Sequence, residues 1–211
     1  MIPNPTLLKR KIMNTWQAAF NRWHTEVYLN TPSVELEPHM HVSHGMTRTC
    51  ELDLLCKIAT GHSYIEIGSG RGFSLLLMKS MGIECFGFDH LSEVLDGLGT
   101  SYINCEILKG SQITEEFQER FTVLVRGVAG AGAGAGAGAA APPLFVYCDN
   151  GHKVEELRYV APLLSKGDIL GTHDWPTEVP EDFSLDGYEL ITEYDEYIKH
   201  YACLQRFWQK K

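Results

Sequence analysis

The sequence predicts an α/β fold built on a doubly wound, mostly parallel sheet that ends in an antiparallel hairpin. Through the middle of the chain, short apolar runs alternate with segments whose apolar residues have helical spacing, the pattern of parallel strands connected by helices. One apolar run, at residues 64–67, leads directly into a glycine-rich turn and a further helical segment. The 211 residues fit one domain with a substantial core.

Each element can be placed along the chain from its pattern. Residues 6–28 have apolar side chains at helical spacing, and a second helix is expected at 48–59, before the sheet. The expected parallel strands are 64–67, 84–89, 104–108, 144–148 and 168–171. The helices expected between or after them are 73–80, 113–121 and 154–164. Near the end of the chain, two strands joined by a turn are expected at 188–193 and 202–208, which gives the hairpin.

Composition and charge exclude several classes of function. Hydrophobic residues make up 44% and charged residues 21% of the chain, proportions typical of a soluble globular protein. The net charge of -9 argues against a nucleic-acid partner and against binding to an anionic membrane surface. The chain shows no secretory signal pattern and no apolar segment long enough to span a bilayer. Six scattered cysteines without a Cys-x-x-Cys pair are expected to be free thiols in a reducing compartment, which favours the cytoplasm.

Three glycines at alternate positions follow the acidic residue Glu66, namely Gly68, Gly70 and Gly72. A strand that turns into a helix in this way brings backbone amides and the partial positive charge of the helix N-terminus close to a ligand. The dinucleotide fingerprint requires two residues between its second and third glycines, and Phe73 stands where that third glycine would be. A nicotinamide-dependent oxidoreductase is therefore the least favoured enzyme, and a plain glycine turn is the alternative without a ligand.

Polar residues also follow the second and third expected strands, at the sheet edge where open α/β sheets bind ligands. Asp89 can accept hydrogen bonds from a ribose diol, and His90 beside it belongs to the same expected cofactor-binding set. The alternative for Asp89 is a solvated strand end. After the third expected strand, Gly110 permits close approach of a ligand, and Ser111 and Gln112 can bond an adenine edge.

The fourth and fifth expected strands end in a group of carboxylates and imidazoles. Asp149 and His152 follow one strand, and His173 and Asp174 follow the next. Such side chains can ligate a divalent metal or act as a general base toward a substrate hydroxyl. The alternative is that the two aspartates cap helices or turns and that the histidines are ordinary strand-end and helix-end residues.

Two of these patterns resemble a known family. The run Glu66-Ile67-Gly68-Ser69-Gly70-Arg71-Gly72 resembles the first motif of the class I S-adenosylmethionine-dependent methyltransferases. Asp149-x-x-His152, a helix, and Thr172-His173-Asp174 resemble the small-molecule O-methyltransferase branch, which includes cephalosporin-hydroxylase-type, macrocin-type and catechol-type enzymes. The antiparallel end of the sheet is also similar to the Rossmann-like fold of this class.

The resemblance implies S-adenosylmethionine as the cofactor and a small molecule, most directly its hydroxyl, as the methyl acceptor. The implied cofactor-binding residues are Glu66, Gly68, Ser69, Gly70, Gly72, Asp89, His90, Gly110, Ser111, Gln112 and Asp149. The implied catalytic residues are His152, Asp149 and His173, with His152 as the proton acceptor. The alternative function is a non-catalytic S-adenosylmethionine-binding or scaffold protein of the same fold.

The resemblance also points to a metal, with one departure from the family pattern. Catechol-type enzymes place a metal-binding aspartate at the position of Asp149, but an Asp-Asn pair where this chain has His173 and Asp174. Asp149, His173 and Asp174 are therefore candidate ligands for Mg²⁺ or another divalent cation, and whether a metal is required stays open.

The expected domain organisation is simple. Residues 1–60 should form a helical extension and a lid loop, and residues 61–211 the methyltransferase domain. The Ala-Gly tract at 129–141 is expected to be a flexible surface loop within that domain. His39, His41 and His44 either belong to a lid over the pocket or are solvated loop residues. The sequence leaves open whether the chain forms a homo-oligomer.

Overall fold

The architecture was taken from a computed structural model, which describes residues 49–70, 72–90, 101–131 and 141–211. The expected helix at 6–28 and the three histidines at 39, 41 and 44 lie outside the described residues.

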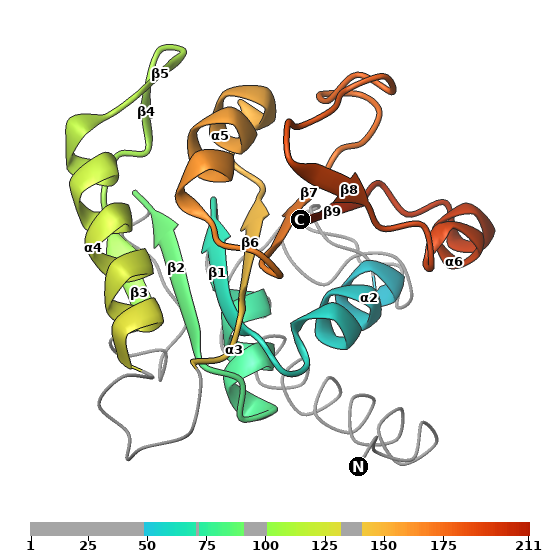
Figure 1. Cartoon of the computed structure of the whole chain (residues 1–211), viewed down its shortest axis with the longest axis horizontal. Coiled ribbons are helices and arrows are strands. Elements are labelled where there is room, and N and C mark those ends of the chain that lie inside the picture. Colours follow the sequence, from blue (N-terminus) through green and yellow to red (C-terminus); the bar gives the residue numbers. More distant parts are fainter. Residues whose placement is uncertain (1–48, 71, 91–100, 132–140) are drawn as a thin grey trace, which may run out of the picture.

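A seven-stranded sheet forms the centre of the described structure, in the order β3-β2-β1-β6-β7-β9-β8 (Figure 1). Its strands are β1 (Ser63–Ile67), β2 (Cys85–Asp89), β3 (Tyr102–Asn104), β6 (Leu144–Cys148), β7 (Ile169–Thr172), β8 (Tyr188–Leu190) and β9 (Arg206–Lys210). Strands β3, β2, β1, β6 and β7 run parallel, whereas β9 is antiparallel to both β7 and β8. The predicted doubly wound sheet with an antiparallel end is confirmed.

Helices cover both faces of this sheet. They are α2 (Thr49–Ala59), α3 (Phe73–Ser80), α4 (Glu115–Ala131), α5 (Lys153–Val160), followed by the 3₁₀ turn η3 (Ala161–Leu163), and α6 (Asp195–Tyr201). Residues of α2, α3 and α6 pack in one hydrophobic cluster, and residues of α4, α5 and η3 pack in a second. Figure 1 shows α4 and α5 on one side of the sheet and α3 on the other. No helix in the described part of the chain has the length and apolarity needed to cross a membrane.

The central strands are apolar because both of their faces are covered. All five residues of β1 are buried, and all five of β6. Along β1 the side chains alternate between the two clusters, with Tyr64 in the first and Ile65 and Ile67 in the second. This burial on both faces explains why the strands read as continuous apolar runs in the sequence.

One predicted strand lies elsewhere. Strand β3 is Tyr102–Asn104, earlier than the expected 104–108. Cys105 and Ile107 are buried in the second cluster after the chain has left the sheet, so their apolar character reflects core packing without strand pairing. The next residues form a separate antiparallel pair, β4 (Leu108–Lys109) with β5 (Gln112–Ile113).

Two other connections differ from their predictions. Helix α4 begins later than expected and continues to Ala131, so the first three residues of the Ala-Gly tract are helical. Residues 132–140 of that tract lie outside the described residues. The strands of the terminal hairpin are joined through α6 and not by a simple turn, because Ile198 of this helix packs into the first cluster.

Candidate functional site

Four of the sequence-predicted site residues meet at one edge of the sheet. Ile67 of β1 is paired with Phe88 of β2 and with Cys148 of β6, and Cys148 is paired with Thr172 of β7. The next residue of each strand therefore falls in one row. That row consists of Gly68, Asp89, Asp149 and His173. Adjacent positions in such a row are about 5 Å apart, so a single ligand can span several of them.

The centre of the row is the point where the strand order reverses, between β1 and β6. Gly68 has φ +84, and a Cβ added to it would lie 2.5 Å from the Asp149 carbonyl oxygen. The Asp149 backbone N–H donates to the Ile67 carbonyl at 2.8 Å. Only glycine fits here, because the backbones after the two strands touch and the conformation is left-handed.

The carboxylate of Asp89 connects the glycine turn to the end of β2 through hydrogen bonds. It accepts the Gly70 backbone N–H at 2.7 Å through Oδ2 and the His90 backbone N–H at 2.7 Å through Oδ1. The backbone N–H groups of Gly68 and Ser69 donate to the Phe88 carbonyl at 2.9 and 3.2 Å. Gly72 then caps α3 with φ +82. The turn after β1, the Asp89 carboxylate and the N-terminus of α3 thus lie next to one another.

Glu66 lies on β1 two residues before this row and is buried. The Ser74 hydroxyl on α3 donates to its Oε2. Burial raises the pKa of Glu66 to about 8, and the charges of Asp149 and Asp89 act in the same direction against the Ser74 hydrogen bond. A carboxyl group with this pKa is mostly protonated near neutrality.

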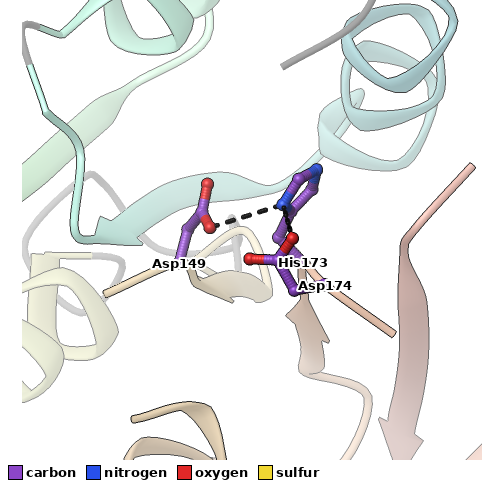
Figure 2. A group of neighbouring side chains, drawn as sticks. All are labelled: Asp149, His173 and Asp174. Carbon is purple, nitrogen blue, oxygen red and sulfur yellow. Dashed lines mark ion pairs between the residues drawn. The ribbon is translucent and has the colours of Figure 1, made fainter. Parts of the chain in front are cut away.

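Asp149, His173 and Asp174 form a compact group at the β6 and β7 end of the row. His173 Nδ1 lies 3.6 Å from Asp149 Oδ1 and 3.1 Å from Asp174 Oδ1. Figure 2 shows both carboxylates directed at this one ring nitrogen. One ligand atom from each of the three residues lies within 4.8 Å of the others, so the group could hold a metal ion.

Two of these groups titrate far from their ordinary values. Burial raises the pKa of Asp149 to about 7, against the opposing charges of His173 and Lys153. Burial alone would lower the pKa of His173, but its contacts with Asp174 and Glu51 and the charge of Asp149 raise that pKa to about 10. His173 is therefore an imidazolium at neutral pH, whereas Asp149 exchanges a proton near neutrality.

Sequence reasoning missed Lys153, the first residue of α5. Its side chain is 2% exposed, and its Nζ lies 2.8 Å from Asp174 Oδ2, 2.8 Å from Glu178 Oε2 and 3.6 Å from Asp149 Oδ1. The available signal was its spacing, since Lys153 follows Asp149 by four residues and directly precedes the predicted helix at 154–164.

Sequence reasoning also missed Glu51 of α2, which is 1% exposed. Its Oε2 lies 3.3 Å from His173 Nε2, and its Oε1 accepts the Leu204 backbone N–H at 2.9 Å. His173 is therefore held between Glu51 on one ring nitrogen and the two aspartates on the other. No pattern in the sequence marks Glu51, because it lies 122 residues from His173 along the chain.

Comparisons with known proteins bear on the fold of this site. The chain matches no protein-family model and no curated protein. A solved structure described as "cmcI-N160 SAH" superposes with a TM-score of 0.50 over 87% of this chain and 89% of the other, at 15% sequence identity. With the sheet order and the antiparallel β9, this likeness decides the fold. The chain has the Rossmann-like class I methyltransferase fold.

Two further solved structures are similar at a lower level. The MycE methyltransferase with Mg and SAH has a TM-score of 0.43 and 15% identity, over 78% of this chain. This chain spans about half of MycE, 49% of its length. The O-methyltransferase from Bacillus cereus with SAH has a TM-score of 0.43 and 12% identity, over 100% of this chain and 93% of the other.

Several predicted residues of this methyltransferase fold lie at the margin of the site. His152 is the N-cap residue of α5, and its side chain is exposed, whereas the neighbouring Lys153 points into the acidic group. Gly110 and Ser111 form the tip of the β4–β5 hairpin, and Gln112 begins β5. They do not follow a strand of the main sheet, so the reasoning that placed them at an adenine edge does not apply to their observed positions.

Lys153 limits how well Asp149, His173 and Asp174 can bind a metal ion. Two carboxylates and an imidazole are ligand types that divalent cations accept. However, the carboxylates that would serve as ligands already lie 2.8 and 3.6 Å from the Lys153 ammonium group. A metal ion bound by this group would therefore compete with the Lys153 ammonium group for the same carboxylates.

Proposed function

We propose that this protein is an S-adenosylmethionine-dependent methyltransferase that acts on a hydroxyl of a small molecule. The observation that carries the proposal is the row of Gly68, Asp89, Asp149 and His173 at the strand-order reversal of a methyltransferase fold. It places a glycine turn and a carboxylate suited to a ribose beside a group suited to a substrate hydroxyl. The net charge of -9 favours a small acceptor over a nucleic acid or membrane surface.

The cofactor would lie over the glycine turn, with each residue in a defined role. Asp89 would bind the ribose diol, since its carboxylate is already oriented by the Gly70 and His90 amides. The N-terminus of α3, with its partial positive charge, would face the carboxylate of the methionine part. A Cβ at Gly70 would meet no heavy atom of the described residues within 4 Å, which leaves room above the turn.

The reaction requires little from the protein beyond alignment and removal of one proton. The bound cofactor supplies a methyl group on sulfonium, which leaves as the neutral thioether. The acceptor oxygen forms the new bond to the methyl carbon, and its proton has to pass to a protein group. Asp149 can take this proton because it lies on the substrate side of the turn and exchanges a proton near neutrality.

His173 would act on Asp149 and on the acceptor as a fixed positive charge. Its ring is held by Glu51, Asp149 and Asp174, so its orientation is set before a substrate arrives. His152 is retained as a second proton acceptor, since its exposed side chain follows Asp149 by three residues. Comparing Asp149→Asn with His152→Ala in a methyl-transfer assay separates the two roles.

Calorimetric titration of S-adenosylhomocysteine into the wild-type protein and Asp89→Asn tests the cofactor site. The asparagine oxygen can still accept the Gly70 amide, so the turn should keep its shape while the second acceptor oxygen is lost. We expect wild-type binding and at least about tenfold weaker binding by Asp89→Asn, or about 1.4 kcal/mol. Asp182→Ala, which removes an exposed carboxylate remote in sequence from the site, should bind as wild type.

The possible outcomes separate the candidate functions. If the wild type does not bind S-adenosylhomocysteine, the proposal is wrong. Binding of a nicotinamide dinucleotide in its place would support the oxidoreductase. Binding without methyl transfer to any member of a panel of phenols, catechols and sugar alcohols would favour the non-catalytic alternative.

A further inference from the structure

We propose that the Lys153 ammonium group is the built-in cation of this site and that the site works without a divalent metal. The inference concerns the substrate half of the proposed methyltransferase site. It rests on the proposed function, but its test measures whether a metal binds and does not measure turnover. The inference can therefore fail while the proposed function holds, and the proposed function can fail while the inference holds.

The contacts of the ammonium group carry the proposal. An ammonium group has three N–H donors. Here it has three carboxylates around it, those of Asp174 and Glu178 at 2.8 Å and that of Asp149 at 3.6 Å. Two of the three are the carboxylates that would otherwise ligate a metal ion. The lysine nitrogen thus already neutralises both of the carboxylates that a metal ion would need.

Lys153 and His173 contact the same two aspartates. Lys153 Nζ and His173 Nδ1 each lie next to Asp149 and next to Asp174. A divalent ion bound to Asp174 would lie next to the Lys153 ammonium group, and charges of like sign at such a distance repel strongly where water is scarce. Metal entry therefore requires Lys153 to leave.

The position of Lys153 on its helix supports a dedicated role. It is the first residue of α5, where the partial positive charge of the helix disfavours a cation. Its side chain is also almost completely buried, which disfavours a charge again. The contacts with the three carboxylates offset these two costs. The ammonium group is held there by the same side chains that define the substrate site.

A fixed ammonium group supplies part of what a metal supplies in related chemistry. It holds two carboxylates at a set separation and places positive charge near the oxygen that gives up its proton. It does so without the open coordination positions that let a metal bind both oxygens of a diol. The acceptor is therefore expected to need a single hydroxyl, not a vicinal pair.

The experiment is a Mn²⁺ titration without cofactor, read by electron paramagnetic resonance of the free ion. It compares the wild type, Lys153→Met, Lys153→Arg and the surface control Lys166→Met. We expect no binding in the millimolar range by the wild type, Lys153→Arg or Lys166→Met. Lys153→Met leaves three carboxylates around a vacated position and should bind Mn²⁺ at least about tenfold more tightly than the wild type.

Every outcome decides for or against the proposal. Wild-type binding of Mn²⁺ would overturn it, as would a Lys153→Met protein that binds no better than the wild type. If Lys153→Met folds only when Mn²⁺ is present, the metal has replaced the ammonium group and the proposal stands. If that variant stays unfolded with Mn²⁺, as judged by circular dichroism, a metal cannot replace the lysine and the proposal fails.

Discussion

At the scale of single residues, the carboxyl group of Glu66 in the buried strand β1 makes the stability of the protein depend on pH. The pKa of its carboxyl group is raised from 4.5 to about 8, so the folded protein holds this proton more tightly than the unfolded chain does. Its contribution to stability is therefore complete below pH 4.5 and is lost as the pH rises through 8. We expect the free energy of unfolding to fall by up to about 1.4 kcal/mol per pH unit within this window from this group.

Urea unfolding of the wild type and Glu66→Gln across this window measures the effect. The glutamine cannot ionise, yet its amide oxygen can still accept the Ser74 hydroxyl. Glu66→Gln should therefore flatten the pH dependence, and the exposed control Glu189→Gln should leave it unchanged. An equally steep dependence in Glu66→Gln would show that Glu66 does not hold its proton in the folded state.

Residues of the candidate site differ in how far the sequence could predict them. Asp89, Asp149 and His173 directly follow strands, and the strand ends of a parallel sheet meet at one edge. Glu51 could not be found in this way, because its contact with His173 depends on how α2 packs against the sheet. The same holds for Lys153, whose neighbour His152 carried the resemblance but points to solvent.

At the scale of elements, the close contact between the ends of β1 and β6 requires glycine at position 68. A Cβ at Gly68 would overlap the backbone of Asp149 at 2.5 Å and would sit at φ +84. We expect Gly68→Ala to lower the free energy of unfolding by at least about 3 kcal/mol, since a steric clash adds to left-handed strain. Thermal and urea unfolding measure this loss.

Gly82 provides the matched control for this element. Its φ is +78, close to that of Gly68, but a Cβ there would meet nothing within 4 Å. Gly82→Ala should therefore cost only the backbone strain, about 1 kcal/mol. Equal losses in the two variants would contradict the tight contact between the ends of β1 and β6.

Element boundaries show what an apolar run can predict. Strands β1, β2, β6 and β7 were predicted within one residue of their observed ends, because each is covered on both faces and is therefore mostly apolar. Strand β3 lies at the edge of the sheet, and its residues are half-buried or exposed. There the most apolar residues come after the strand, which shifted the prediction.

At the scale of the whole molecule, the last strand of the chain, β9, lies between β7 and β8 in the sheet. Phe207 of β9 is 0% exposed and packs against the rings of Phe145 and Tyr147, with centroids 5.9 and 6.4 Å away. We expect Phe207→Ala to lower the free energy of unfolding by about 3–5 kcal/mol, because a large cavity opens in the first cluster. Chemical unfolding measures this loss of free energy.

Val123→Ala is the control for this prediction, since Val123 is 71% exposed on α4. Its effect should stay within about 0.5 kcal/mol. A similarly small loss for Phe207→Ala would show that β9 is not part of the cooperative core. The antiparallel strands at the end of the chain were predicted from the sequence, but their connection through α6 was not, because α6 is short and mostly exposed.

Helix α2 has a practical consequence for handling this protein in pieces. It precedes residue 61, where the sequence suggested that the domain begins, yet its apolar residues lie in the first cluster and Tyr197 of α6 donates to Asp53 at 2.9 Å. A chain shortened to start at residue 61 would expose one face of the sheet and leave His173 without Glu51. The smallest fragment suitable for crystallisation or ligand screening therefore has to include Thr49–Ala59.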